Sequence, residues 1–181
     1  MKVKFTILLL LLISGLYAQK WDVYKNQEFG FRANFEGEMK TINQLIPVGD
    51  ESIEMNMFFV DNSANSSASN IIYSVAHTAY KKDEYAKENP ERDDLVLNSA
   101  VNGASKNVNG SILSNENFTL NGFPGKQSKI EIQGGYIHLK LILVKHELYF
   151  VQVICSIDKD DNNDISRFFD SFDILKIKKN H

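Results

Sequence analysis

The segment "YIHLKLILVKHELYFVQVICSI", residues Tyr136 to Ile157, contains two strands joined at Lys145-His146, and it decides the fold. One face of each strand is a run of alternating apolar residues: Ile137, Leu139, Leu141 and Leu143 on the first, and Tyr149, Val151, Val153, Cys155 and Ile157 on the second. The opposite faces are also apolar, with Ile142, Val144 and Phe150 among them. Strands that are apolar on both faces are typical of the centre of a sheet that is covered on both sides. We therefore expect this hairpin in the middle of an antiparallel sheet.

Further strands are predicted on the N-terminal side of this hairpin. Phe29, Phe31, Ala33 and Phe35 recur with a period of two, which marks a half-buried strand. Residues 41–49 are extended, and Pro47 favours an edge position. Residues 52–61 and 71–80 flank a polar loop, so they are expected to form an antiparallel hairpin. In the first of these two strands, one face is expected to carry Ile53, Met55, Met57 and Phe59.

A helix is predicted after a charged connector, residues 81–94. Asp93 or Asp94 is a suitable N-cap residue. The helix face is formed by apolar residues at helical spacing: Leu97, Val101, Ala104 and Val108. Asn109-Gly110 should end the helix, with the glycine in the left-handed conformation. The segments "NGFPGK" (121–126) and Gly134-Gly135 then read as turns between strands.

A second, shorter helix is predicted near the end of the chain in "ISRFFDSFDILK", residues 165–176. Asn163 or Asp164 is the expected cap. Its apolar stripe, which needs a sheet to cover it, is formed by Ile165, Phe168, Phe169 and Phe172. A last strand near 172–177 is expected to join a sheet edge. These patterns predict one α+β domain, residues 19–181, built as an α-β-α sandwich whose central antiparallel sheet has a helix packed on each face.

The first 18 residues have the layout of a secretory signal peptide, with Lys2 and Lys4 before an apolar run from Phe5 to Ile13 and Ala18 at the expected cut. We therefore expect a periplasmic or secreted protein with no stable membrane span after cleavage, since the apolar run is shorter than the roughly 20 residues that a spanning helix needs. The formal net charge of -3 argues against a nucleic-acid partner. Cys155 is the only cysteine, which excludes an internal disulfide and favours a buried thiol.

Several segments together resemble one known family. They are "NGFPGKQSKIEI", "LILVKHELYFVQVIC", "RFFDSFDIL" and the opening "FGFRANFEGEMK". In this order and spacing, they resemble PsbP-like domains, the superfamily of the photosystem II extrinsic protein. The chain departs from the pattern at Glu36, where the family often has proline. The resemblance implies an α-β-α sandwich, no shared catalytic apparatus and, from its better understood members, binding to protein partners.

The loop "DKDDNND" carries oxygen ligands at alternate positions, Asp158, Asp160, Asn162 and Asp164, as calcium loops do. The match fails at Asn163, where glycine is needed, and at Phe169, where a bidentate glutamate is needed. We favour a solvated loop with a helix cap and leave a weak calcium site as the alternative.

Other catalytic patterns are absent from the sequence. His77, His138 and His146 fall on or beside separate strands, and no HExxH or Gly-x-Ser-x-Gly motif occurs. The connector contains five acids, Glu84, Glu88, Glu91, Asp93 and Asp94, which are expected on a wet surface. We therefore predict no catalytic, cofactor or metal residues and no enzymatic activity.

The sequence favours an exported, non-enzymatic protein-binding or scaffold module of the cell envelope, with another envelope protein as its partner. The alternative is a small-molecule or lipid binder with a pocket between sheet and helix, lined by Met55, Met57, Phe58 and Phe59. A hydrolase whose acids and histidines meet only in the fold is a third hypothesis.

Overall fold

The computed structural model describes residues 21–48 and 51–175 of the chain. Within these residues, the larger sheet has seven strands, all antiparallel, in the order β3-β4-β5-β9-β8-β7-β6. Its strands are β3 (Lys40–Val48), β4 (Glu51–Asp61), β5 (Ile72–Ala79), β6 (Ser111–Leu120), β7 (Phe123–Ile132), β8 (Gly135–Val144) and β9 (Glu147–Ser156). The predicted hairpin, β8–β9, lies inside this sheet, and β3 lies at an edge, as the sequence indicated.

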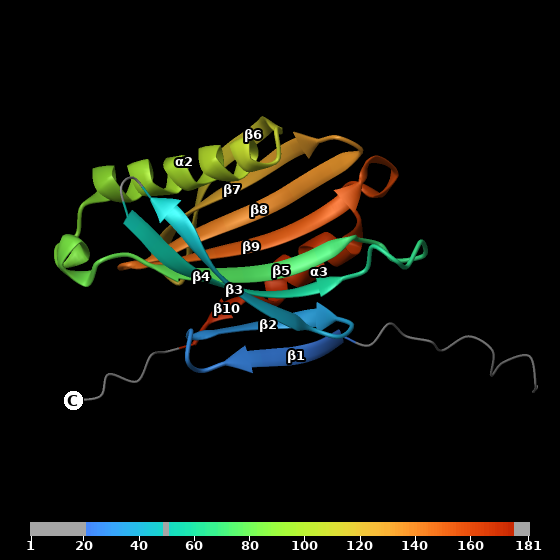
Figure 1. Cartoon of the computed structure of the whole chain (residues 1–181), viewed down its shortest axis with the longest axis horizontal. Helices are drawn as coiled ribbons and strands as arrows, with labels where there is room; N and C mark the ends of the chain where they lie inside the picture. Colours follow the sequence, from blue (N-terminus) through green and yellow to red (C-terminus); the bar gives the residue numbers. More distant parts are fainter. Residues whose placement is uncertain (1–20, 49–50, 176–181) are drawn as a thin grey trace, which may run out of the picture.

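A second sheet of three strands contains the N-terminal strand of the sequence prediction. It consists of β1 (Trp21–Asn26), β2 (Phe31–Glu36) and β10 (Asp173–Ile174), and β2 pairs antiparallel with both neighbours. The expected last strand therefore does reach a sheet edge, but that edge belongs to the small sheet. Figure 1 shows the β1–β2 hairpin on the side of the molecule away from α2.

Alternate residues of β8 and β9 supply two separate core clusters. The first joins residues of β8 such as Leu139 and Leu141 to Leu97 and Val101 of helix α2 (Pro90–Asn107). Figure 1 shows α2 lying along β6, β7 and β8. Lys126 of β7 is buried under this helix, and its Nζ lies 2.8 Å from a carboxylate oxygen of Asp94. This ion pair ties the first turns of α2 to the sheet.

The second cluster is rich in aromatic side chains. It joins Val151 and Val153 of β9 to Phe31 and Phe35 of the small sheet and to Phe168 of helix α3 (Asn163–Ser171). The Phe168 ring centroid lies 5.4 Å from that of Phe35 and 5.2 Å from that of Tyr73. The α+β class is confirmed. The simpler α-β-α sandwich is not, because the small sheet shares this cluster with α3.

Several local predictions need correction. Helix α2 starts earlier than expected, with Asn89 as its N-cap and Pro90 in its first turn, because the amide oxygen of Asn89 accepts the Arg92 N–H at 3.0 Å. The left-handed residue at its end is Asn109, with φ 51°, and not Gly110. Glycine is required at position 110 for a different reason: the chain passes so close to β7 that a Cβ there would lie 2.7 Å from the Glu131 carbonyl oxygen.

The strand predictions also differ in detail. In β4 the side chains that join the aromatic cluster are Phe58 and Val60. On the face predicted to carry Ile53, Met55, Met57 and Phe59, Met55 is buried and the other three side chains are half-buried. The turn before β7 is confined to Asn121-Gly122, both with positive φ, and Pro124 lies in the strand. Ile157 was predicted to continue the buried face of β9, but it lies beyond the end of that strand, in the short 3-10 turn η2 (Ile157–Lys159), and is 59% exposed.

The predicted signal peptide, residues 1–18, lies outside the described residues, as does the end of the last predicted strand. In the part of the chain that the structure describes, no helix combines the length and the apolar character that crossing a bilayer requires.

Candidate functional site

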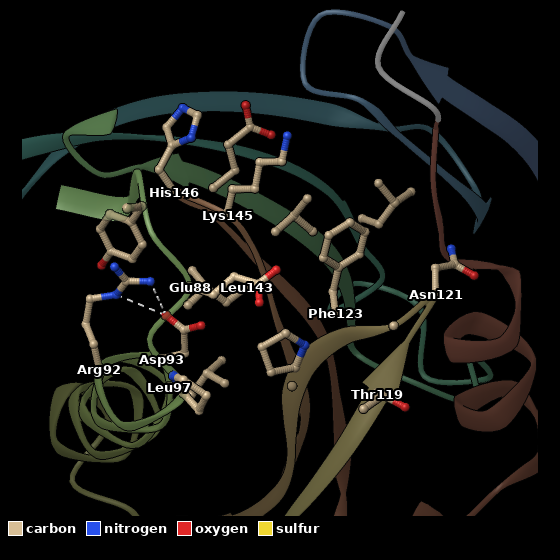
Figure 2. A pocket seen from close by; sticks show the side chains of 18 of the residues that line it. Glu88, Arg92, Asp93, Leu97, Thr119, Asn121, Phe123, Leu143, Lys145 and His146 are labelled. Carbon is tan, nitrogen blue, oxygen red and sulfur yellow. Dashed lines mark hydrogen bonds and ion pairs between the residues drawn. The ribbon is translucent and has the colours of Figure 1, made fainter. Parts of the chain in front are cut away.

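A large open groove lies at one end of the seven-stranded sheet, where the β6–β7 and β8–β9 turns meet the start of α2. The 3-10 turn η1 (Lys82–Tyr85), the ends of β1 and β2, and β10 complete its walls. Its volume is about 2460 Å³. Figure 2 shows Arg92 and Asp93 on one side of the groove, and Phe123, Thr119 and Asn121 on the other. Segments from almost the whole length of the domain therefore build one surface.

The floor of the groove is apolar. Leu97 of α2 and Leu143 of β8 are 2% and 1% exposed, and they close the bottom. The half-buried side chains of Phe118, Phe123 and Pro124 rise from the β6–β7 hairpin. This hairpin lies so close to β8 that a Cβ at position 125 would be 2.5 Å from the Leu141 carbonyl oxygen, and only glycine fits there. Apolar surface is thus available at the base of a wide opening.

The connector before α2 is held in shape by Arg92. Its Nη1 donates to the carbonyl oxygens of Glu84 at 2.7 Å and of Lys87 at 3.2 Å. Its Nη2 lies 2.6 Å from a carboxylate oxygen of Asp93, and its guanidinium carbon lies 4.2 Å from the centroid of the Tyr85 ring. Burial raises the pKa of Tyr85 to about 12. The charged connector is therefore an ordered wall of the groove.

The rim carries both signs of charge. Six acids line the groove, and four of them have partners within the fold: Asp93 with Arg92, Asp94 with Lys126, Asp173 with Arg32, and Glu147 with the Tyr149 hydroxyl. Six Lys or Arg side chains also line it, and four of these have no ion-pair partner among the residues that the structure describes: Lys25, Lys82, Lys87 and Lys145. The groove therefore presents more unpaired positive than negative charge.

Behind Glu147, a buried histidine lies between aromatic rings. The His77 ring centroid is 4.9 Å from that of Phe29 and 5.1 Å from that of Tyr149. Its Nε2 lies 3.9 Å from a Glu147 carboxylate oxygen, which is too long for a hydrogen bond, and neither ring nitrogen has a hydrogen-bond partner in the described residues. The proximity of His77 holds the pKa of Glu147 below its usual value, against the effect of burial.

The opposite end of the same strands holds the predicted calcium loop. Its residue Asp160 accepts a hydrogen bond from Lys129 of β7 and lies 2.8 Å from the Nε2 of His138 on β8. Burial works to raise the pKa of Asp160, but the bonds to Lys129 and His138 outweigh it and the pKa falls below its usual value. The Cys155 thiol lies within 4.8 Å of His138 and Asp160 ligand atoms. It is fully buried, as expected, and burial raises its pKa to about 11.

The other oxygen-bearing residues of that loop do not join Asp160. Asn162 caps α3, with its side-chain oxygen accepting the N–H groups of Asp164 at 3.0 Å and Ile165 at 3.3 Å. Asp158 is exposed and lies outside the group formed by His138, Cys155 and Asp160. The loop is therefore occupied by capping and ion pairing, and its four predicted oxygen ligands do not converge.

The structure places the remaining predicted candidate residues in different parts of the molecule. The three strand-associated histidines do not form one site, because His138 lies at the far end from His146, which lines the groove, and from the buried His77. Met55, Met57, Phe58 and Phe59, the expected pocket lining, do not line the groove. Four of the five connector acids are exposed as predicted, and the fifth, Asp93, is half-buried. Three of them, Glu88, Asp93 and Asp94, also line the groove. The charged composition of that connector was the only sequence signal for this site.

The fold of this chain is PsbP-like, in agreement with the resemblance seen in the sequence. The solution structure of cyanobacterial PsbP (CyanoP) from Synechocystis sp. PCC 6803 matches with a TM-score of 0.50 and 10% sequence identity, covering 89% of this chain and 96% of that chain. At this identity the likeness shows the fold alone. No family model matches the chain, and no curated protein does either.

Proposed function

We propose that this chain is an exported, non-enzymatic binding module that docks a partner protein of the cell envelope in the groove. The observation that carries the proposal is the groove itself, which combines an apolar floor with unpaired charges on an ordered rim. Its volume, about 2460 Å³, exceeds the roughly 300–1000 Å³ of pockets that enclose small ligands. A wide opening of this kind suits a segment of a protein better than a small molecule.

Three acidic side chains of the groove are held in arrangements that do not favour general acid catalysis. Of its acidic side chains, Asp93 and Asp94 are engaged by Arg92 and Lys126, so they are held as charged structural partners. A general acid would need a raised pKa, which burial without a cation provides. The groove residue Glu147 has instead a lowered pKa. These features support binding in preference to hydrolysis.

Site-specific photo-crosslinking in the native host tests the docking. A photoreactive residue would replace Asn117 or Thr119, which line the groove from β6. The matched control is Glu116, which is exposed on the same strand and does not line the groove. We expect one envelope protein, identified by mass spectrometry, to crosslink at Asn117 and Thr119 and to form a complex when both proteins are purified. Equal crosslinking at Glu116, or none at the two groove positions, would contradict the proposal.

Export is tested separately by cell fractionation and N-terminal sequencing of the protein from its native host. We expect the protein outside the cytoplasm, with a new N-terminus after Ala18. A cytoplasmic protein that retains Met1 would contradict the exported part of the proposal and would leave the docking part to the crosslinking result.

A further inference from the structure

We infer that the groove accepts an extended protein segment rich in Asp and Glu, with apolar side chains between the acids. This inference rests on the proposed docking function and adds the chemistry of the partner. It follows from the charges that the fold leaves unpaired, from a pair of like charges on the small sheet, and from the apolar floor of the groove.

The first step concerns the unpaired charges. The cations without partners in the described structure are Lys25, Lys82, Lys87 and Lys145, whereas the groove acids without partners there are Asp83 and Glu88. All four of these lysines are exposed, so their ammonium groups can reach a bound segment. The chain as a whole has a formal net charge of -3, so this excess of free cations is local to the groove. A local cationic rim on an acidic protein favours an acidic partner at that place.

The second step concerns Lys25 and Arg32, which face the groove from the small sheet. They are directly opposed on β1 and β2, in register. Like charges at such positions repel and lower the stability of the sheet. Asp173 of β10 neutralises Arg32, with 3.1 Å between the charged groups, but it leaves Lys25 without a partner in the described residues. A carboxylate of a bound segment would relieve this repulsion.

The third step concerns the floor. Leu97, Leu143 and the half-buried ring of Phe123 line the same groove as the cations of the connector and those of the small sheet. Apolar side chains of a partner can be buried there while its acids reach the rim on both sides. A phosphate backbone would also be attracted by lysines, but it carries no apolar side chains between its charges that the floor could bury. We therefore favour a protein segment over a nucleic acid.

Fluorescence anisotropy with the mature chain, residues 19–181, tests the inference. The probes are a labelled peptide of repeated Glu-Phe-Glu-Gly units, the same peptide with Lys in place of Glu, and a single-stranded oligothymidine of matched charge. We expect only the Glu peptide to bind, with an affinity that falls as salt rises, because exposed charges are screened. Binding of the Lys peptide or of the oligothymidine with equal or higher affinity would overturn the inference.

Two charge-reversed double variants locate the binding. Lys25→Glu with Lys82→Glu changes two groove lysines, and Lys40→Glu with Lys106→Glu makes the same change in charge at exposed positions outside the groove. We expect the groove variant to weaken binding of the Glu peptide about tenfold and the control variant to change it less than about twofold. Equal weakening by both variants would show non-specific attraction and overturn the inference.

The two proposals fail in different ways. If crosslinking at Asn117 and Thr119 identifies a partner but the Glu peptide does not bind, the acidic chemistry is wrong and the docking function stands. If those positions yield no site-specific crosslink, the docking function itself falls.

Discussion

The two ends of the seven-stranded sheet carry similar loops and use them differently. At one end, the β9–α3 loop contains "DKDDNND", and several of its charged and amide groups bond to the protein itself. Asp160 contacts Lys129 and His138, Asn162 caps α3, and Lys159 donates to the carbonyl oxygens of Ser66 and Ala68. At the other end, the groove leaves four lysines without ion-pair partners in the described structure. We call these the closed end and the open end.

The difference shows that charge density in a loop does not indicate function by itself. A charged side chain that is paired within the fold contributes to stability and has little left for a partner, whereas an unpaired one on an ordered wall is available for binding. The closed end should therefore be sensitive to mutation in stability measurements, and the open end in binding measurements.

The largest effect on stability is expected from Phe168→Ala, in the helix that begins at the closed end. Its side chain is 0% exposed and packs between Phe35 and Tyr73, so its loss leaves a cavity that should cost about 3–5 kcal/mol of unfolding free energy. Urea denaturation measures this loss. Phe123→Ala, at the half-buried floor of the open end, is the control and should cost clearly less. Equal losses would mean that the floor is as tightly packed as the core.

The next effect is expected from Asp160→Asn, which removes the nearer charged partner of Lys129 and leaves only Asp161, whose carboxylate oxygen lies 3.7 Å from the Lys129 Nζ. We expect a loss of about 1–3 kcal/mol at neutral pH. Glu88→Gln at the open end should change stability by less than about 0.5 kcal/mol, because Glu88 is exposed and has no ion pair in the described residues.

The same substitution has a predictable pH dependence. The folded protein lowers the pKa of Asp160 below the ordinary value of 3.8, so the carboxylate stabilises the fold above that value. This stabilisation is lost as the pH falls through the lowered folded pKa. The difference in urea midpoint between the wild type and Asp160→Asn should therefore be full at neutral pH and shrink in acid. A difference that grows in acid would contradict the assigned contacts.

A smaller effect distinguishes the two helix caps. Asn89→Ala removes one cap bond to the Arg92 N–H of α2 and should cost about 1 kcal/mol. Asn162→Ala should cost more, about 2 kcal/mol, because its amide nitrogen also donates to Asn70 Oδ1 at 2.9 Å and to the Lys159 carbonyl oxygen at 2.7 Å. Thermal unfolding of both variants measures the contrast, and equal costs would mean that the extra bonds at the closed end contribute nothing.

Much of the fold follows from short patterns in the sequence. The β8–β9 hairpin was predictable because both faces of each strand are apolar, and α2 and α3 because their apolar residues recur at helical spacing. The caps were less predictable. Asp93 and Asn163 are chemically as suitable as Asn89 and Asn162, and only the backbone geometry decides between them.

Features that depend on distant segments were missed. The alternation of Phe31, Ala33 and Phe35 predicts a strand but does not say which sheet it joins, so the small sheet did not appear. The groove was missed for the same reason, because Lys25, Lys82 and Lys145 lie far apart in the chain and meet only after folding. The pairing of Asp160 with Lys129 depends likewise on the register of β7 and β8.

The smallest effect on stability, and the sharpest test of the two ends, is expected from Lys25→Glu. Lys25 is exposed and opposes Arg32, so a glutamate there replaces repulsion with attraction and should raise the unfolding free energy by about 0.2–1 kcal/mol. The gain should shrink at high salt, which urea unfolding at two ionic strengths measures. If the substitution destabilises the protein instead, Lys25 has a structural role like that of Lys129, and the open end is not free for a partner. A gain in stability together with weaker binding of the acidic peptide would mean that this lysine is retained at a cost to the fold.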